Sequence, residues 1–223
     1  MVQISHSPYG GHAFGVHLAY LAGRQPEHGV AVFSGQELRP STGASRRKAE
    51  RRRSVCPVAP VLRGKKVSAL AITEPGGGSD VASLRTRADK DGDCYVVNGS
   101  KTFITSGTRA DFVTAAVRTG GAQHGGISLI IIEADTPGYS VSKKLKKTGW
   151  WASDTAELSF EDCRVPAENL IGPENAGFVA IMTNFTQERL LLAAQCVAIA
   201  ELALREAHAY SKERQAFGRP IAG

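Results

Sequence analysis

The chain has 223 residues, of which 42% are hydrophobic and 22% are charged, ordinary values for a soluble globular protein. Its 27 Lys and Arg residues against 21 Asp and Glu residues give a formal net charge of +6. Residues 39–53 hold seven basic residues and one acidic residue, so this segment accounts for the whole excess. A uniformly basic surface for nucleic acid is therefore disfavoured, and we expect no nucleic-acid partner.

The location of the protein follows from what the sequence lacks. It has no apolar run of about 18 residues, so we expect no membrane span. Its first residues have no positively charged region followed by an apolar stretch, so we expect a cytoplasmic protein. The sequence contains neither a CxxC pair nor an HExxH motif, and we expect no metal site.

Residues 1–57 differ from the rest of the chain. They are rich in Gly, Pro, His and Arg and show weak hydrophobic periodicity, so we expect an atypical, poorly ordered segment. The basic run at residues 39–53 fits an exposed helix or disorder equally well, because nothing apolar would give such a helix a buried face.

Residues 58–172 are predicted to form a β-domain. Apolar runs separated by turn residues indicate about seven short strands, at residues 67–73, 94–97, 101–105, 112–117, 127–132, 139–143 and 155–160. Asn98-Gly99 is a strong hairpin signal between two of them, because both residues tolerate positive φ. Strands at this spacing predict an antiparallel β-barrel or sandwich.

Residues 173–223 are predicted to begin a helical domain. From about Asn175 to Arg214 there is no Pro, and apolar residues recur at helical spacing. Such a helix would have about 40 residues and a length of roughly 60 Å. Its middle is apolar almost all round, which requires burial among other helices that this sequence does not contain. The expected fold class is therefore α+β, with a β-domain followed by a long helix of an incomplete C-terminal bundle.

The stretch from Thr73 to Asp80, TEPGGGSD, carries the clearest chemical signal. A strand ends in a Gly-rich turn that bares main-chain N–H groups and adds two hydroxyls, which suits an anionic or carbonyl-rich ligand. It is neither a Walker loop nor a GxGxxG dinucleotide fingerprint. A flexible turn without a ligand is the alternative.

Several motifs together resemble the acyl-CoA dehydrogenase family. The family-like stretches are residues 73–80, 98–105, 162–169, 172–178 and 213–221. They occur in the family's order, and the match begins near Pro60 and covers about three quarters of the chain. Phe103 stands where the family usually has Trp. The resemblance implies a flavoprotein oxidoreductase of fatty acid β-oxidation that uses FAD.

The resemblance also implies roles for individual residues. The cofactor-binding residues would be Leu70, Ile72, Thr73, Ser79, Phe103, Ile104, Thr105 and Arg214. Thr73 would bond the pyrimidine edge of the flavin, Thr105 would bond near N5, and Phe103 would pack on the ring. Ser79 would also contact the acyl-CoA, and Arg214 would reach the FAD of a partner subunit.

The family reaction removes the α-proton of an acyl-CoA while the β-hydride passes to flavin N5. The base must be a carboxylate in a dry pocket. Long-chain and isovaleryl-type members carry it in a Glu-Arg pair on the first long C-terminal helix, which matches Glu188 and Arg189 here. An ordinary helix glutamate without a catalytic part is the alternative. Thr186 and Arg189 would line the substrate site.

The resemblance further implies an electron-transferring flavoprotein or a similar electron acceptor, and a homo-oligomer (dimer or tetramer). Residues 1–57 do not resemble the family's N-terminal helical domain, and the remaining C-terminal helices are absent from the sequence. The chain is therefore interpreted as a fragment, and two alternatives stay open. One is an inactive truncated remnant of the family, and the other is a basic module that binds nucleic acid or a surface through residues 39–53.

Overall fold

The computed structural model describes residues 58–121 and 123–222. Residues 1–57, including the basic run at 39–53, lie outside the described residues, so the expectations for them stay predictions. The chain divides into two compact units, one ending at Ala180 and the other beginning at Ile181. The domain limits expected from the sequence also stay predictions.

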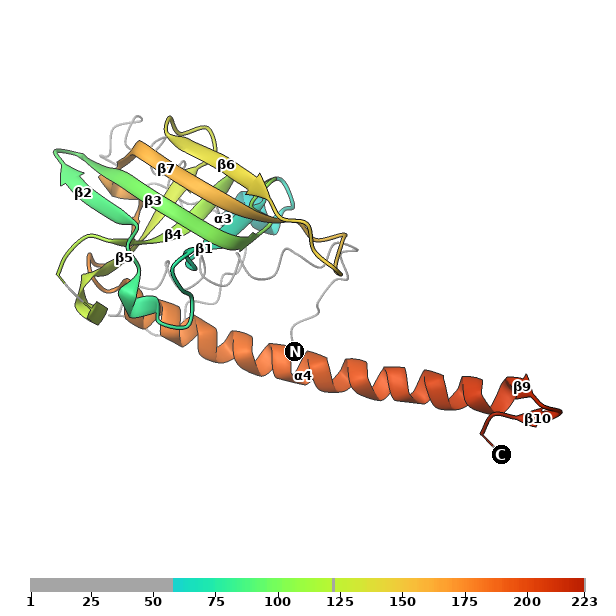
Figure 1. The fold of residues 1–223 in the computed structure, drawn as a ribbon. Helices are drawn as coiled ribbons and strands as arrows, with labels where there is room; N and C mark the ends of the chain where they lie inside the picture. The colour runs from blue at the N-terminus through green and yellow to red at the C-terminus, as the bar shows by residue number, and fades with distance from the viewer. Residues whose placement is uncertain (1–57, 122, 223) are drawn as a thin grey trace, which may run out of the picture. The chain divides into compact units, whose positions relative to one another are not determined.

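The first unit is built on an eight-stranded sheet with the order β6-β7-β3-β2-β4-β5-β8, in which β1 also pairs with β4. Its strands are β1 (Ser68–Ala71), β2 (Arg87–Asp91), β3 (Cys94–Thr105), β4 (Phe112–Arg118), β5 (Ile127–Glu133), β6 (Tyr139–Lys144), β7 (Thr155–Pro166) and β8 (Leu170–Ile171). Short helices lie between them: α3 (Val58–Leu62), η1 (Val81–Ser83), η2 (Gln123–Gly126) and η3 (Ala167–Asn169). Figure 1 shows the long strands β3 and β7 side by side in this sheet.

The sheet is mixed and open, so the expectation of an antiparallel barrel was wrong in that detail. β1 runs parallel to β4, and β2 meets β4 in parallel at Arg87 and Arg118. Both β1 and β2 pair with β4, at different positions along it, and both run parallel to it. Among the described strands, β6 and β8 end the sheet. The β-domain followed by one long helix is confirmed.

The hydrophobic core lies against one face of this sheet. Its largest fully buried side chains include Tyr95, Ile130, Ile132, Leu158 and Phe160. β4 and β5 are buried at nearly every position, on both faces. This is why both strands read in the sequence as continuous apolar runs rather than as alternating patterns.

The hairpin expected at Asn98-Gly99 was wrong, because β3 continues through this point. The register between β3 and β7 shifts there, which is a β-bulge. Asn98 stabilises the bulge, since its Oδ1 accepts the N–H of Asp162 at 2.8 Å and its Nδ2 donates to the Asp162 carboxylate at 3.1 Å. The tight turn lies instead at Gly92 (φ 59°), between β2 and β3.

The helix α4 spans Gly177–Glu213, which confirms the helix expected at about 175–214. It is followed by a small hairpin of β9 (Gln215–Ala216) and β10 (Arg219–Pro220). Several large apolar side chains of α4 are exposed: Leu190, Leu191, Leu192, Val197, Ile199, Leu202, Leu204 and Tyr210. Among the described helices, none is long and apolar enough to cross a membrane. The cytoplasmic location stays a prediction.

Candidate functional site

The end of β1 lies beside β3, and this contact brings together most of the residues predicted to bind a cofactor. The N–H of Thr102 donates to the Thr73 carbonyl at 2.9 Å, and the Thr73 hydroxyl donates back to the Thr102 carbonyl. Thr73 and Leu70 are therefore on a segment adjacent to Phe103 and Thr105. Thr73 and Leu70 are half-buried, whereas Phe103 and Thr105 are exposed.

Strand alternation decides which of these side chains a ligand can reach. Ala69, Ala71 and Ile104 point into the hydrophobic core. Ile104 is 1% exposed, so any contact it makes with a cofactor would come from its main chain. Ile72 is also buried, at 5%, which limits its contact with a ligand.

Phe103 has an unusual conformation. Its side chain is 70% exposed, and its backbone has φ 59°, in the left-handed region that L-residues avoid. It lies where the register of β3 against β7 shifts, between Lys101 and Ile104. The irregular backbone keeps Lys101, Thr102 and Ile104 buried and leaves the aromatic ring between them in solvent. Strained residues of this kind cluster at ligand sites.

A buried ion pair lies beneath this segment, and reasoning from the sequence missed it. Lys101 Nζ lies 2.8 Å from Glu74 Oε1, and the two side chains are 0% and 9% exposed. Lys101 Nζ also donates to the Ile72 carbonyl at 3.0 Å. The signal in the sequence was a charged residue inside each of two motifs, at Thr73-Glu74 and at Ser100-Lys101.

The two charges of this pair respond differently to burial. Burial lowers the pKa of Lys101 to about 8, although the negative charge of Glu74 opposes the change. Burial alone would raise the pKa of Glu74, but the charge of Lys101 and hydrogen bonds from Lys101, Thr86 and Arg85 outweigh it. The pKa of Glu74 is therefore held below its usual value, and Glu74 stays a carboxylate at neutral pH.

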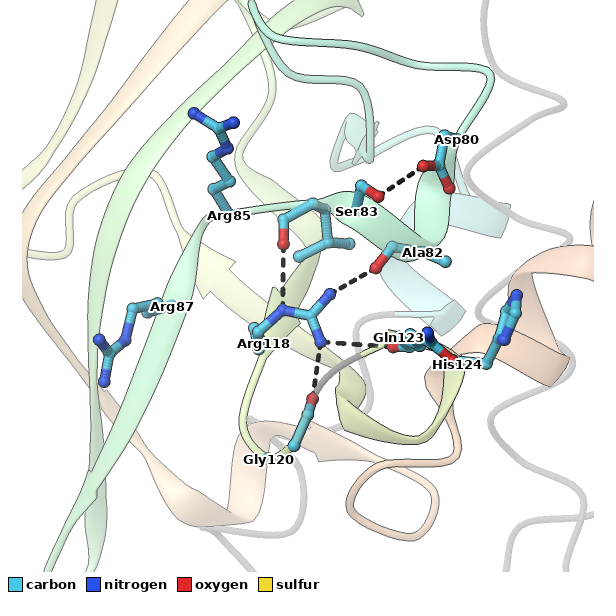
Figure 2. Close-up of a pocket in the computed structure, with 11 residues that line it drawn as sticks. Asp80, Ala82, Ser83, Arg85, Arg87, Arg118, Gly120, Gln123 and His124 are labelled. Carbon is cyan, nitrogen blue, oxygen red and sulfur yellow. Dashed lines mark hydrogen bonds between the residues drawn. The ribbon is translucent and has the colours of Figure 1, made fainter.

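An open pocket of about 850 Å³ lies next to the Gly-rich turn (Figure 2). Its lining includes Asp80, Arg85, Arg87, Gln123 and His124. Ser79, which was predicted to contact a ligand, is exposed directly before Asp80.

Arg118, also in the pocket wall, is a structural clamp. Its guanidinium donates to the carbonyls of Ala82 at 2.6 Å, Gly121 at 2.8 Å and Leu84 at 3.1 Å. Figure 2 shows these bonds tying η1 to the loop after β4. Arg85 and Arg87 supply the other positive charges of the wall.

The residues predicted on α4 and after it belong to the second unit. Glu188 is half-buried, and the Asn184 amide donates a hydrogen bond to its carboxylate. The Thr186 hydroxyl donates to the Met182 carbonyl at 3.0 Å. The Arg189 guanidinium lies 5.7 Å from the centre of the Phe185 ring. A further predicted residue, Arg214, is exposed after the helix.

Among the described residues, no group of three or more His, Cys, Asp or Glu side chains is placed to hold a metal ion. The chemistry available in the first unit is instead an aromatic ring and a hydroxyl on β3 and a hydroxyl just after β1, with an arginine-bearing pocket beside them. Such a set suits a flat organic ring with polar edges and an anionic ligand.

Comparison with known families decides between the possible ligands. The acyl-CoA dehydrogenase middle domain matches residues 69–163, and the acyl-CoA dehydrogenase C-terminal domain matches residues 175–223. The chain belongs to the acyl-CoA dehydrogenase family. Members of this family are FAD-dependent flavoproteins and oxidoreductases, so the resemblance found in the motifs is confirmed.

Individual acyl-CoA dehydrogenases resemble this chain closely over part of their length. The long-chain specific mitochondrial enzyme of Sus scrofa is 45% identical over 71% of this chain and 38% of its own length. An acyl-CoA dehydrogenase of Bacillus subtilis is 47% identical over 71% of this chain and 42% of its own length. The chain thus spans about two fifths of these relatives.

Solved structures give the same result. A probable acyl-CoA dehydrogenase from Mycobacterium abscessus superposes with a TM-score of 0.74 and 57% identity, over 80% of this chain and 46% of its own. A chain from a structure of the electron transferring flavoprotein of Acidaminococcus fermentans superposes with a TM-score of 0.70 and 44% identity, over 74% of this chain and 44% of its own.

Proposed function

We propose that this chain provides the flavin-contacting β-domain and the start of the helical domain of an acyl-CoA dehydrogenase. The reaction would be α,β-desaturation of an acyl-CoA thioester. The observation that carries the proposal is the junction of β1 and β3, where Thr73 lies beside the strand that exposes Phe103 and Thr105.

The residues at this junction fit FAD. The exposed ring of Phe103 offers an apolar face to the flavin, in place of the Trp usual in the family. The hydroxyls of Thr73 and Thr105 suit its polar edges, and Leu70 would lie alongside the ring. When bound, FAD supplies the hydride acceptor, and the residues of this chain orient it. Arg214 would serve the FAD of a partner subunit.

The CoA part of the substrate fits the pocket beyond Ser79. Acyl-CoA carries several phosphate charges, and Arg85 and Arg87 give the pocket wall a positive character. Arg118 already bonds to four main-chain carbonyls and would hold the wall in place. Ser79 would contact both the cofactor and the acyl-CoA from the rim.

Glu188 would be the base that takes the α-proton. The amide of Asn184 donates to its carboxylate, which would orient the carboxylate on the helix. Thr186 and Arg189 would line the acyl site on the same helix, at one turn or less from the base. The alternative is that Glu188 is an ordinary helix glutamate without a catalytic part, and replacing it by Gln separates these two interpretations.

The experiment is an absorbance spectrum of the purified full chain with added FAD, before and after addition of an acyl-CoA. We expect a yellow protein whose flavin absorbance bleaches as the substrate is oxidised. Glu188→Gln should bind FAD but fail to bleach, whereas Glu201→Gln, an exposed glutamate of the same helix, should bleach normally. Colourless protein that FAD cannot reconstitute would identify an inactive remnant, and bleaching by Glu188→Gln would exclude Glu188 as the base.

The same reaction requires a protein that accepts electrons from the reduced flavin. The reduced flavin must pass its electrons on, and we propose an electron-transferring flavoprotein or a similar acceptor. The similar chain found in a structure of such a flavoprotein supports this choice. A homo-oligomer is supported by the exposed apolar side chains of α4.

A further inference from the structure

We infer that the buried Lys101–Glu74 ion pair is a positioning element of the flavin site, which fixes the Gly-rich turn after β1 to strands β2 and β3. The inference rests on the proposed function, in which Thr73, Ser79 and Phe103 meet the flavin. Neither charge would touch the cofactor. The pair would act through the main chain that carries the contacting residues.

The lysine holds Thr73 from both sides. Its Nζ donates to the carbonyl of Ile72 at 3.0 Å and to the carboxylate of Glu74 at 2.8 Å, the two residues that flank Thr73. The Lys101 side chain is completely buried, so water does not compete for these bonds. Because Lys101 is two residues before Phe103, one side chain links the two segments that would face the flavin.

The glutamate closes the turn at its far end. Glu74 Oε2 accepts the N–H of Arg85 at 2.7 Å, and Oε1 accepts the N–H of Thr86 at 2.9 Å. The main chains of Glu74 and Gly77 also exchange two hydrogen bonds of 3.0 Å. Both ends of the turn therefore meet on a single carboxylate, which is itself fixed by Lys101.

Apart from main-chain bonds and the clamp of Arg118 on Ala82 and Leu84, the Gly-rich part of the turn has no apolar anchor. Residues 75–77, 79 and 80 are exposed, so the hydrophobic core does not order them. A buried ion pair contributes little net stability, because the cost of removing two charges from water offsets their attraction. The Glu74 carboxylate accepts the main-chain N–H groups of Arg85 and Thr86 only when the turn has the observed conformation. The pair therefore favours that one conformation. The pair thus specifies a conformation more than it stabilises the fold.

The test uses two variants of the full chain, Lys101→Met and Glu74→Gln, each of which removes one charge of the pair. A swapped variant, Glu74→Lys with Lys101→Glu, restores opposite charges but offers no acceptor to Arg85 and Thr86. The matched control is Arg164→Gln, which breaks an exposed ion pair of the same length with Asp91 (2.8 Å), away from the pocket. Hydrogen exchange by mass spectrometry reports the turn, and titration with FAD reports the cofactor site.

We expect amide exchange in residues 73–86 to accelerate by about tenfold or more in both removals, while β4 and β5 keep their protection. FAD affinity should fall by about tenfold or more, and the swapped variant should not restore it. The Arg164→Gln control should match the original chain in both measurements.

Three results would overturn the inference: an unchanged turn, exchange that rises equally through the whole sheet, or a loosened turn with unchanged FAD affinity. Failure of the original chain to bind FAD would overturn the proposed function instead. In that case exchange alone decides whether the pair anchors the turn: selective acceleration in residues 73–86 supports it, and unchanged exchange refutes it.

Discussion

Phe103 would trade stability for the flavin contact that we propose for it. A left-handed φ costs an L-residue about 1–2 kcal/mol, and the exposed ring recovers little of it by packing. We expect Phe103→Gly to leave the free energy of unfolding unchanged or to raise it by up to about 1 kcal/mol, since glycine accepts this φ. The affinity for FAD should fall at the same time.

Chemical denaturation and a titration with FAD measure the two effects. Phe103→Ala is the matched control, because it removes the ring but keeps the strain. It should lose FAD affinity without any gain in stability. A large loss of stability in Phe103→Gly would show that the ring packs against the fold and is not reserved for a ligand.

Asp154 gives a prediction about pH. Burial alone would raise the pKa of this carboxyl, but hydrogen bonds from the N–H and hydroxyl of Thr108 and the charge of Arg109 hold it below its usual value of 3.8. Its stabilising contribution is therefore complete above about pH 4 and is lost as the pH falls through the lowered pKa. Asp154→Asn should cost about 1–3 kcal/mol at pH 7, the range for hydrogen bonds to a charged group.

Urea denaturation between pH 7 and pH 2 checks this prediction. The difference between Asp154→Asn and the original chain should shrink below pH 4. Asp135→Asn removes an exposed aspartate and should show no such dependence. A difference that stays constant down to pH 2 would mean that the charge of Asp154 contributes nothing.

At the scale of the elements, the bulge in β3 depends on close contact with the residue before β2. A Cβ at Gly99 would lie 2.7 Å from the Cα of Thr86, and Gly99 has φ +144°. We expect Gly99→Ala to destabilise the protein by about 2 kcal/mol or more, because the neighbouring main chain must shift. Thermal melting compares it with Gly76→Ala, where a Cβ meets open space. Equal melting temperatures would contradict the prediction.

The elements that the sequence predicted share one property, which is a repeating apolar pattern. β4, β5 and α4 were found because burial requires apolar residues at regular spacing. β2 was missed because four of its five residues are exposed, and main-chain pairing with β3 holds it in the sheet. Asn98-Gly99 was mistaken for a turn because the same two residues suit a bulge.

The candidate site was proposed from the family-like motifs and not from an apolar pattern. The motifs pointed to Thr73, Phe103 and Thr105, and β1 and β3 do lie side by side there. The Lys101–Glu74 pair could not be predicted, because the spacing of two charges in sequence says nothing about their contact across strands. The pocket wall could not be predicted either, since Arg118 reaches it only through the register of β4 with β2.

At the scale of the whole molecule, the exposed apolar side chains of α4 predict association. An apolar surface of this extent on a helix is normally covered by another chain or domain. We expect the average mass in sedimentation experiments to rise with protein concentration. Leu191→Glu combined with Leu204→Glu should lower it, whereas Gln195→Glu, at an exposed polar position, should not. A monomer at every concentration would contradict this prediction.

The place of β1 in the sheet has a consequence for synthesis on the ribosome. β1 precedes the other strands of the sheet in the chain, yet it lies between β3 and β4, which are made later. The strand itself, which carries Leu70, therefore lacks its parallel partner until β4 has left the exit tunnel. During this interval its apolar residues are available to other nascent chains or to chaperones. The strand next to the proposed flavin site is thus also open to misassembly during translation.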